Sequence, residues 1–135
     1  MPTILVSACL IGLCTRYDGT SKPSPFIQGL LKKHILIPFC PEQLGGLKTP
    51  RPPAELSGGD GFAVLGKKAK VITCHGEDVT QAFIKGAEEA AKLAKLYHAE
   101  KALVKARSPS CGLTPVVGVA AARLILEGLS LEEID

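Results

Sequence analysis

Three of the five cysteines in this 135-residue chain hold similar places in the sequence pattern. Cys9, Cys40 and Cys111 each lie directly after, or shortly after, a short apolar segment. These segments are residues 3–8, 34–39 and 102–106. Short apolar runs that alternate with helical segments are typical of buried parallel strands. Since ligands of open α/β sheets bind at the carboxyl ends of the strands, we expect the three thiols to converge in one crevice and form a shared thiol or metal site.

Each cysteine also has a simpler interpretation, because a buried thiol often serves only as a small apolar side chain. Cys14 could be a fourth ligand, a catalytic thiol or a structural residue, and we favour a position near the site without ligation. Cys74 falls on an expected hairpin and is predicted to be incidental. The histidines follow no metal-ligand spacing, and we expect them to be structural or at the surface. They are His34, His75 and His98.

Polar residues gather in the same loops as the three cysteines. They are Asp18, Glu42, Arg51, Glu55, Ser108 and Ser110. A carboxylate beside a bound small molecule could act as a general acid or base, and Arg51 could bind an anionic or carbonyl oxygen. The structural alternatives are a turn at Asp18, which precedes glycine, an ion pair between Arg51 and Glu55 that braces the loop, and a backbone cap at Ser108.

These loops must be positioned by a sheet and its helices. We expect helices over residues 24–33, 79–97 and 116–126, and a further strand over residues 68–73 that could belong to a hairpin. Strands that alternate with helices predict a single α/β domain over residues 1–135, with a three-layer α/β/α architecture and a mainly parallel, Rossmann-like or flavodoxin-like sheet. Two segments are expected to lack regular strands and helices. Residues 41–61 are predicted to form a functional loop, and residues 129–135 a terminal turn.

Composition excludes several classes of function. With 46% apolar residues the chain can bury a core, yet no apolar run approaches the roughly 20 residues that span a bilayer. Aromatic residues make up only 4% and the net charge is +3, so neither base stacking nor a basic surface predicts nucleic-acid binding. The odd cysteine count argues against a disulfide-stapled secreted protein, and Cys9 lacks the basic, longer leader of a lipoprotein signal. We therefore expect a cytoplasmic protein.

Four segments together resemble a known bacterial family. They are SACLIGLCTRYDG, CPEQLGGLKTPRPPAE, GEDVTQAFIKGAEEA and KARSPSCG. In this order they resemble the domain of unknown function 523 family, whose characterised members include the thiouracil desulfurases, over most of residues 3–112. The resemblance implies a 4Fe–4S cluster held by Cys9, Cys40 and Cys111, with one iron free of any protein thiolate.

The resemblance also implies a reaction. It is the hydrolytic, non-redox removal of sulfur as hydrosulfide from a thiolated, nucleobase-like small molecule by a monomer or homodimer. The open iron would polarise the substrate as a Lewis acid. Candidates for proton transfer and positioning are Asp18, Glu42 and Ser108, and candidates for substrate binding are Arg51, Glu55 and Ser110.

Two alternatives to this reaction stay open. The chain could be a non-enzymatic module that binds a cluster or metal, or a cluster-free enzyme or redox sensor that uses Cys14 or Cys111. A cysteine nucleophile usually has a histidine partner, and no histidine is obviously placed for that role. The short loop at residues 113–115 departs from the family and could change the substrate.

Overall fold

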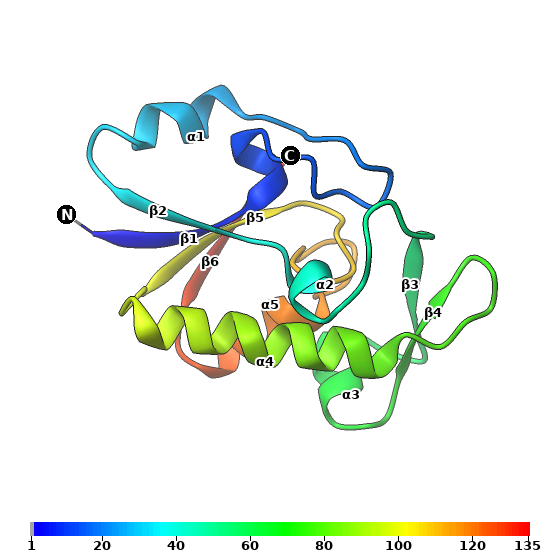
Figure 1. Cartoon of the computed structure of the whole chain (residues 1–135). Coiled ribbons are helices and arrows are strands. Elements are labelled where there is room, and N and C mark those ends of the chain that lie inside the picture. Colours follow the sequence, from blue (N-terminus) through cyan, green and yellow to red (C-terminus); the bar gives the residue numbers. More distant parts are fainter. Residues whose placement is uncertain (1) are drawn as a thin grey trace.

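The computed structural model describes residues 2–135 and contains a main sheet of four parallel strands (Figure 1). The strands are β1 (Thr3–Ser7), β2 (Ile35–Phe39), β5 (Lys101–Lys105) and β6 (Ser130–Ile134). Their order across the sheet is β2-β1-β5-β6, and β1 pairs with both β2 and β5. The chain runs from β1 to β2 on one side and later returns to place β5 on the other side. The connections therefore change direction between β1 and β5, where α/β sheets open a crevice.

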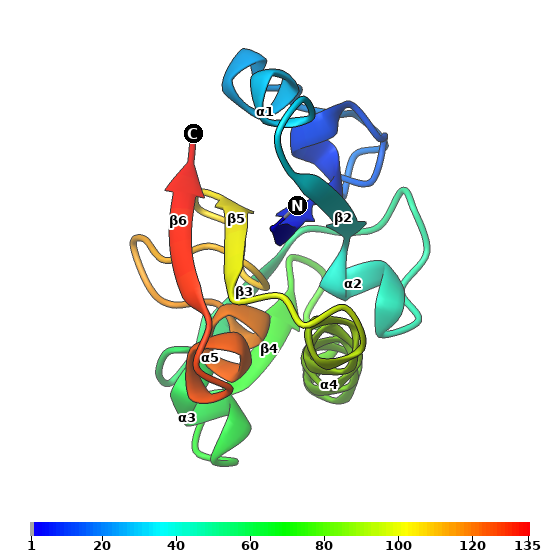
Figure 2. The same ribbon diagram turned by 90° about the vertical axis from the view of Figure 1, so that its left-hand side faces the viewer.

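Both faces of this sheet are covered, which explains why its central strands are apolar along their whole length. On one face Ile4 and Val6 pack against Ile27 of α1 (Pro25–Leu30). On the other face Leu5 packs against α4 (Thr80–Leu96) and α5 (Val119–Leu126). Figure 2 shows α1 on one side of the sheet and α4 and α5 on the other. The predicted α/β architecture, with a mainly parallel central sheet flanked by helices, is confirmed.

The long helix α4 packs through small side chains. Its buried positions are Phe83, Gly86, Ala87, Ala90, Ala91 and Ala94. The helix predicted for residues 79–97 is therefore present, and Tyr97, the residue after its last turn, is half exposed. Small residues let α4 approach its neighbours closely, including the short helix α2 (Pro41–Leu44) that follows β2.

The segment 129–135 is a strand, and the prediction of a terminal turn was wrong. Residues Ser130–Ile134 form β6, which pairs in parallel with β5 along its whole length. Leu131 packs against the core while the glutamates beside it reach the surface. A short segment with two acidic residues has weak intrinsic strand propensity, so the pairing partner decides its conformation.

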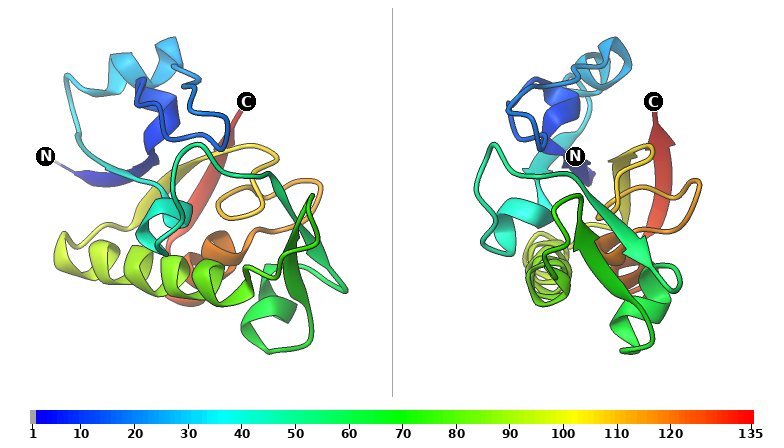
Figure 3. Two further views of the ribbon diagram at one scale, coloured as in Figure 1. Left: turned by 45° about the vertical axis from the view of Figure 1, so that its right-hand side comes forward. Right: turned by 90° about the vertical axis from the view of Figure 1, so that its right-hand side faces the viewer.

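The expected loop over residues 41–61 also contains regular elements. It begins with α2 and includes β3 (Ala54–Ser57), which pairs antiparallel with β4 (Lys70–Thr73) in a separate two-stranded sheet. With α3 (Gly61–Leu65), this sheet packs beside the first turns of α4 and α5, as Figure 3 shows. The hairpin considered for residues 68–73 closes after β4, where Ile72 forms an antiparallel bridge to Asp78, while β4 also pairs with the preceding β3. None of the helices formed by residues 2–135 has both the length and the apolar character needed to span a bilayer.

Candidate active site

The three predicted cysteines line one cavity of about 310 Å³ at the carboxyl ends of β1, β2 and β5. Cys9 lies in the 3-10 helix η1 (Ala8–Ile11) directly after β1. Cys40 follows β2 and is the N-cap residue of α2, whereas Cys111 lies in the loop after β5. The cavity therefore sits where the strand connections change direction, and the predicted convergence of the three thiols is confirmed.

Burial keeps all three thiols away from ready ionisation in the absence of a metal. Burial and the nearby Cys111 thiolate raise the pKa of Cys9 to about 11. Burial likewise raises the pKa of Cys40, although the backbone N–H of Gln43 acts in the opposite direction, and it raises the pKa of Cys111. Since metals bind thiolates, metal binding at this cavity would release protons.

Cys111 is held by hydroxyl groups on two sides. The Ser7 hydroxyl lies 3.1 Å from the Cys111 sulfur and accepts the backbone N–H of Lys105 at 3.0 Å. The Ser7 oxygen is thus occupied as an acceptor, so its proton is free to point at a Cys111 thiolate. On the other side Ser108 Oγ accepts the backbone N–H of Cys111 at 3.2 Å. Ser7 is almost fully buried, at 3% exposure, and sequence reasoning missed it.

The loop that carries Cys111 is anchored by helix α5. The first backbone N–H groups of this helix, at Val119, Ala120 and Ala121, donate to the carbonyl oxygens of Pro109 and Ser110. These N–H groups have no partner inside the helix, and here the loop satisfies them. The start of α5 thereby fixes the backbone on which Ser108, Ser110 and Cys111 are presented.

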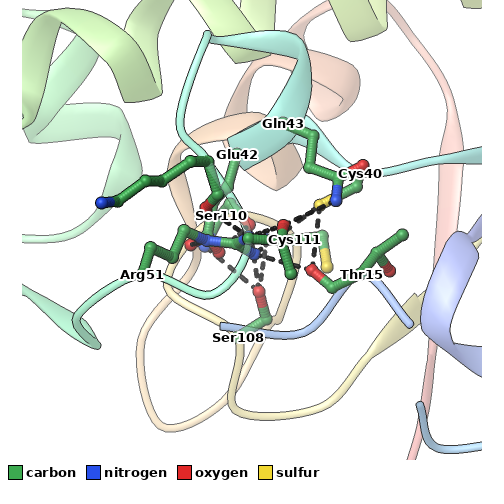
Figure 4. Close-up of polar contacts among 10 residues, drawn as sticks. Thr15, Cys40, Glu42, Gln43, Arg51, Ser108, Ser110 and Cys111 are labelled. Atoms are coloured by element: carbon green, nitrogen blue, oxygen red, sulfur yellow. Dashed lines mark hydrogen bonds and ion pairs between the residues drawn. The ribbon is translucent and has the colours of Figure 1, made fainter. Parts of the chain in front are cut away.

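A chain of hydrogen bonds joins four of the predicted polar residues at the cavity wall (Figure 4). Ser110 Oγ donates to Glu42 Oε2 at 2.9 Å, and the hydroxyls of Ser108 and Ser110 lie 3.1 Å apart. The other oxygen of Glu42 accepts Arg51 Nε–H at 2.9 Å. All four residues line the cavity, so a carboxylate and two hydroxyls stand beside the cysteines in a connected path.

The structure does not bring two other predicted residues to the cavity. The Asp18 carboxylate is exposed and bonds to Thr20, whose hydroxyl holds the pKa of Asp18 below its usual range. Glu55 is an exposed residue of β3, and its proposed ion pair with Arg51 does not form because Arg51 pairs with Glu42. Cys14 and Cys74 are both exposed and neither lines the cavity.

Cationic side chains surround the cysteines. Those lining the cavity are Arg16, Lys22, Arg51, Lys105 and Arg107. Among the described lining residues they face a single carboxylate, that of Glu42. Lys105 is buried, and its burial lowers the pKa of its ammonium group. Apart from Arg51, these cations carried no signal in the sequence, because they come from loops whose positions depend on the whole sheet.

Three cysteine thiols are the donor type that iron–sulfur clusters use. Within residues 2–135, no group of three or more His, Cys, Asp or Glu side chains is arranged to hold one ion. In a cluster each cysteine binds a different iron, so its thiolates stand farther apart than the ligands of one ion. Three free thiols line this one cavity, and cationic side chains lie beside them.

The fold and the site define an α/β protein in which three free cysteines and a carboxylate line one cavity at the strand ends. The family can be named from the sequence. The model of the 2-thiouracil desulfurase family matches residues 4–130, and the chain belongs to this family. The resemblance predicted from the four sequence segments is therefore confirmed.

Two individual proteins are similar to this chain. An uncharacterized protein of Bacillus subtilis (strain 168), YbbK, is 45% identical over 109 residues, which cover 81% of this chain and 72% of YbbK. The solved structure of the [4Fe-4S]-dependent thiouracil desulfidase TudS matches with a TM-score of 0.83 at 37% identity. That match covers 98% of this chain and 91% of the TudS chain, so the two share their fold almost from end to end.

Proposed function

We propose that this protein is a desulfidase that hydrolyses a thiocarbonyl group in a thiolated, nucleobase-like heterocycle. The reaction joins the carbon to a water oxygen, breaks the carbon–sulfur bond and releases hydrosulfide. It is a hydrolysis in which neither the heterocycle nor the sulfur is oxidised or reduced. One observation carries the proposal: three free cysteines and the Glu42–Ser110 pair line the same cavity. Membership of the 2-thiouracil desulfurase family and the likeness to TudS support it.

We further propose that Cys9, Cys40 and Cys111 hold a 4Fe–4S cluster. When bound, the cluster would supply a Lewis-acidic iron without a protein thiolate, a position suited to binding sulfur. The cations that line the cavity offset part of the negative charge of the three thiolates, although Arg51, Lys105 and Arg107 also pair with carboxylates. Free thiols are retained in the reducing cytoplasm, which is where we place the protein.

Glu42 is the proposed general base and acid. Its Oε2 accepts the Ser110 hydroxyl, and Ser110 lies within hydrogen-bond distance of the Ser108 hydroxyl. A water near Ser108 can pass a proton along this path to Glu42 as its oxygen attacks the carbon. The same carboxyl group can return the proton to the leaving sulfur. Ser108 and Ser110 orient the water and the polar edge of the heterocycle.

Iron analysis and a turnover assay test the proposal directly. The protein is reconstituted anaerobically with iron and sulfide and assayed for hydrosulfide release from thiolated pyrimidines. We expect about four irons per chain and loss of both iron and activity when Cys9, Cys40 or Cys111 is changed to serine. The matched control is Cys74→Ser, since Cys74 is an exposed cysteine outside the cavity. A wild-type protein that stays free of iron after reconstitution would refute the cluster.

A non-enzymatic cluster carrier is the second candidate, and the same preparation distinguishes it. A carrier would bind the same iron but release no hydrosulfide from any thiolated base. The Glu42–Ser110–Ser108 path favours the enzyme, because a carrier has no need of a proton path beside its cysteines. A cluster-free cysteine enzyme is less well supported, since none of the described residues lining the cavity is a histidine.

A further inference from the structure

Arg51 uses all of its hydrogen-bond donors within the protein. Nε–H donates to Glu42 at 2.9 Å, and Nη1 donates to Thr49 Oγ1 at 2.8 Å and to the Lys48 carbonyl at 3.3 Å. Nη2 donates to the Thr15 carbonyl at 2.8 Å and to the Cys40 sulfur at 3.8 Å. A guanidinium group has five N–H donors, so each one has an acceptor here.

These contacts leave Arg51 without a free donor for a substrate. Its side chain is only 5% exposed, and moving it toward a ligand would break bonds to partners that are mostly half-buried. Leaving such groups unpaired would cost free energy. The geometry therefore favours a role for Arg51 different from the substrate binding predicted from the sequence.

We propose that Arg51 is a positioning residue that couples the cysteine site to the proposed acid–base group. Through Nε–H it fixes one oxygen of Glu42, so the other oxygen stays directed at Ser110. Through Nη2 it donates to the Cys40 sulfur and holds the Thr15 carbonyl, which the Cys40 thiol also contacts, at 3.7 Å. This inference rests on the proposed function, because it assigns Cys40 to the cluster and Glu42 to proton transfer.

The coupling has two measurable consequences. A cation and an N–H···S bond stabilise the more negative, reduced state of a thiolate-bound cluster, so they raise its reduction potential. Arg51 also sets the orientation of Glu42, which matters in the transition state more than in substrate binding. Loss of Arg51 should therefore lower the reduction potential and lower kcat while leaving KM nearly unchanged.

The test compares two variants of the reconstituted protein with a matched control. Arg51→Gln removes the positive charge and most of the N–H donors. Arg51→Lys keeps the charge but loses the planar guanidinium group, which donates to both Glu42 and the Cys40 sulfur. The control is Arg123→Gln on α5, because Arg123 also forms an ion pair at 2.9 Å, with Glu127, but does not line the cavity. Measurements are the cluster potential by anaerobic titration, and kcat and KM for a thiolated pyrimidine.

We expect Arg51→Gln to give a more negative potential and a kcat reduced about 10- to 100-fold, with KM within about twofold of wild type. Arg51→Lys should recover much of the potential but little of kcat, and Arg123→Gln should match wild type in both. A raised KM with unchanged kcat would overturn the proposal in favour of substrate binding. Wild-type potential and kcat in both Arg51 variants would overturn it as well.

The two readouts separate this inference from the proposed function. The reduction potential of the cluster can be measured without turnover. If the wild-type protein binds a cluster but releases no hydrosulfide, and Arg51→Gln still shifts the potential, the proposed contact of Arg51 with the cysteine site is supported and the proposed enzyme activity is refuted. If Arg51→Gln fails to fold, Arg51→Lys decides, because it retains a buried cation at the same position. A wild-type protein that takes up no iron would refute both proposals.

Discussion

The close contact between α2 and α4 gives the sharpest prediction, because a single added methyl group should displace the candidate active site. Gly86 of α4 and Gly45, which follows α2, let the two backbones meet. A Cβ atom on Gly86 would stand 1.9 Å from the Pro41 carbonyl oxygen and 2.8 Å from its carbon. Both atoms belong to backbone, so no side chain can rotate away to relieve the overlap.

The size of the disturbance follows from these distances. Ordinary contact begins at 3.4 Å, so Gly86→Ala must separate α2 from α4 by about 3.4 − 1.9 = 1.5 Å. Such a shift exceeds what the two 2.9 Å bonds of Glu42 to Arg51 and Ser110 can tolerate. We expect about 1–3 kcal/mol of destabilisation from the overlap, offset in part by about 0.5–1 kcal/mol of gained helix propensity.

Activity should suffer more than stability. Displacement of Glu42 by more than about 1 Å should reduce kcat roughly 100-fold, and the shift of Cys40 should lower the iron content after reconstitution. The assays are thermal unfolding of the apo protein, iron per chain, and hydrosulfide release. The matched control is Gly29→Ala in α1, where an added Cβ meets nothing within 4 Å and should be neutral or slightly stabilising. If Gly86→Ala retains full iron and a kcat within twofold of wild type, the reasoning about the α2–α4 contact is wrong.

Three further predictions concern stability. Burial raises the pKa of the Glu133 carboxyl, but hydrogen bonds from the backbone N–H groups of Leu113 and Thr114 outweigh it and hold this pKa below its usual range. Its contribution should therefore be complete above the pKa of an unfolded glutamate, about 4.3, and should be lost as the pH falls through the lower pKa of the folded state. The deficit of Glu133→Gln in urea unfolding should shrink between about pH 7 and about pH 3.5, and a deficit equal at both would contradict this. Leu124→Ala should cost about 2–5 kcal/mol in the same assay, because Leu124 is fully buried between α5 and the sheet. Ser7→Ala should cost about 1–3 kcal/mol by removing the partner of a buried backbone N–H, and a loss below 0.5 kcal/mol would count against the bond.

The sequence determined three of the four strands of the main sheet, the principal helices and the convergence of the cysteines. Three apolar segments, each followed by a cysteine, predict parallel strands because continuous apolar runs need cover on both faces. Once the strands are parallel, their carboxyl ends must share an edge, and the sulfurs of Cys9, Cys40 and Cys111 must lie near it. This inference needed only local pattern and a rule of topology. The role of the three cysteines as cluster ligands stays a prediction.

The same reasoning could not place the polar residues. Asp18, Glu42 and Glu55 are all expected in loops at the site, and only Glu42, which lies in α2, reaches the cavity. Nor could it find Ser7, whose hydroxyl contacts a cysteine 104 residues away. A side chain's direction in a loop depends on contacts that sequence patterns do not encode.

Only the tertiary structure decided the remaining features. The segment Ser130–Ile134 forms a strand because it pairs with β5. Arg51 is fixed in place because its guanidinium group donates hydrogen bonds to Glu42, to the Thr15 carbonyl and to the Cys40 sulfur. Local patterns record the periodicity of strands and helices, which is a property of neighbouring residues. The partners of a buried polar group are set by packing between distant segments, where free energy is minimised over the whole fold.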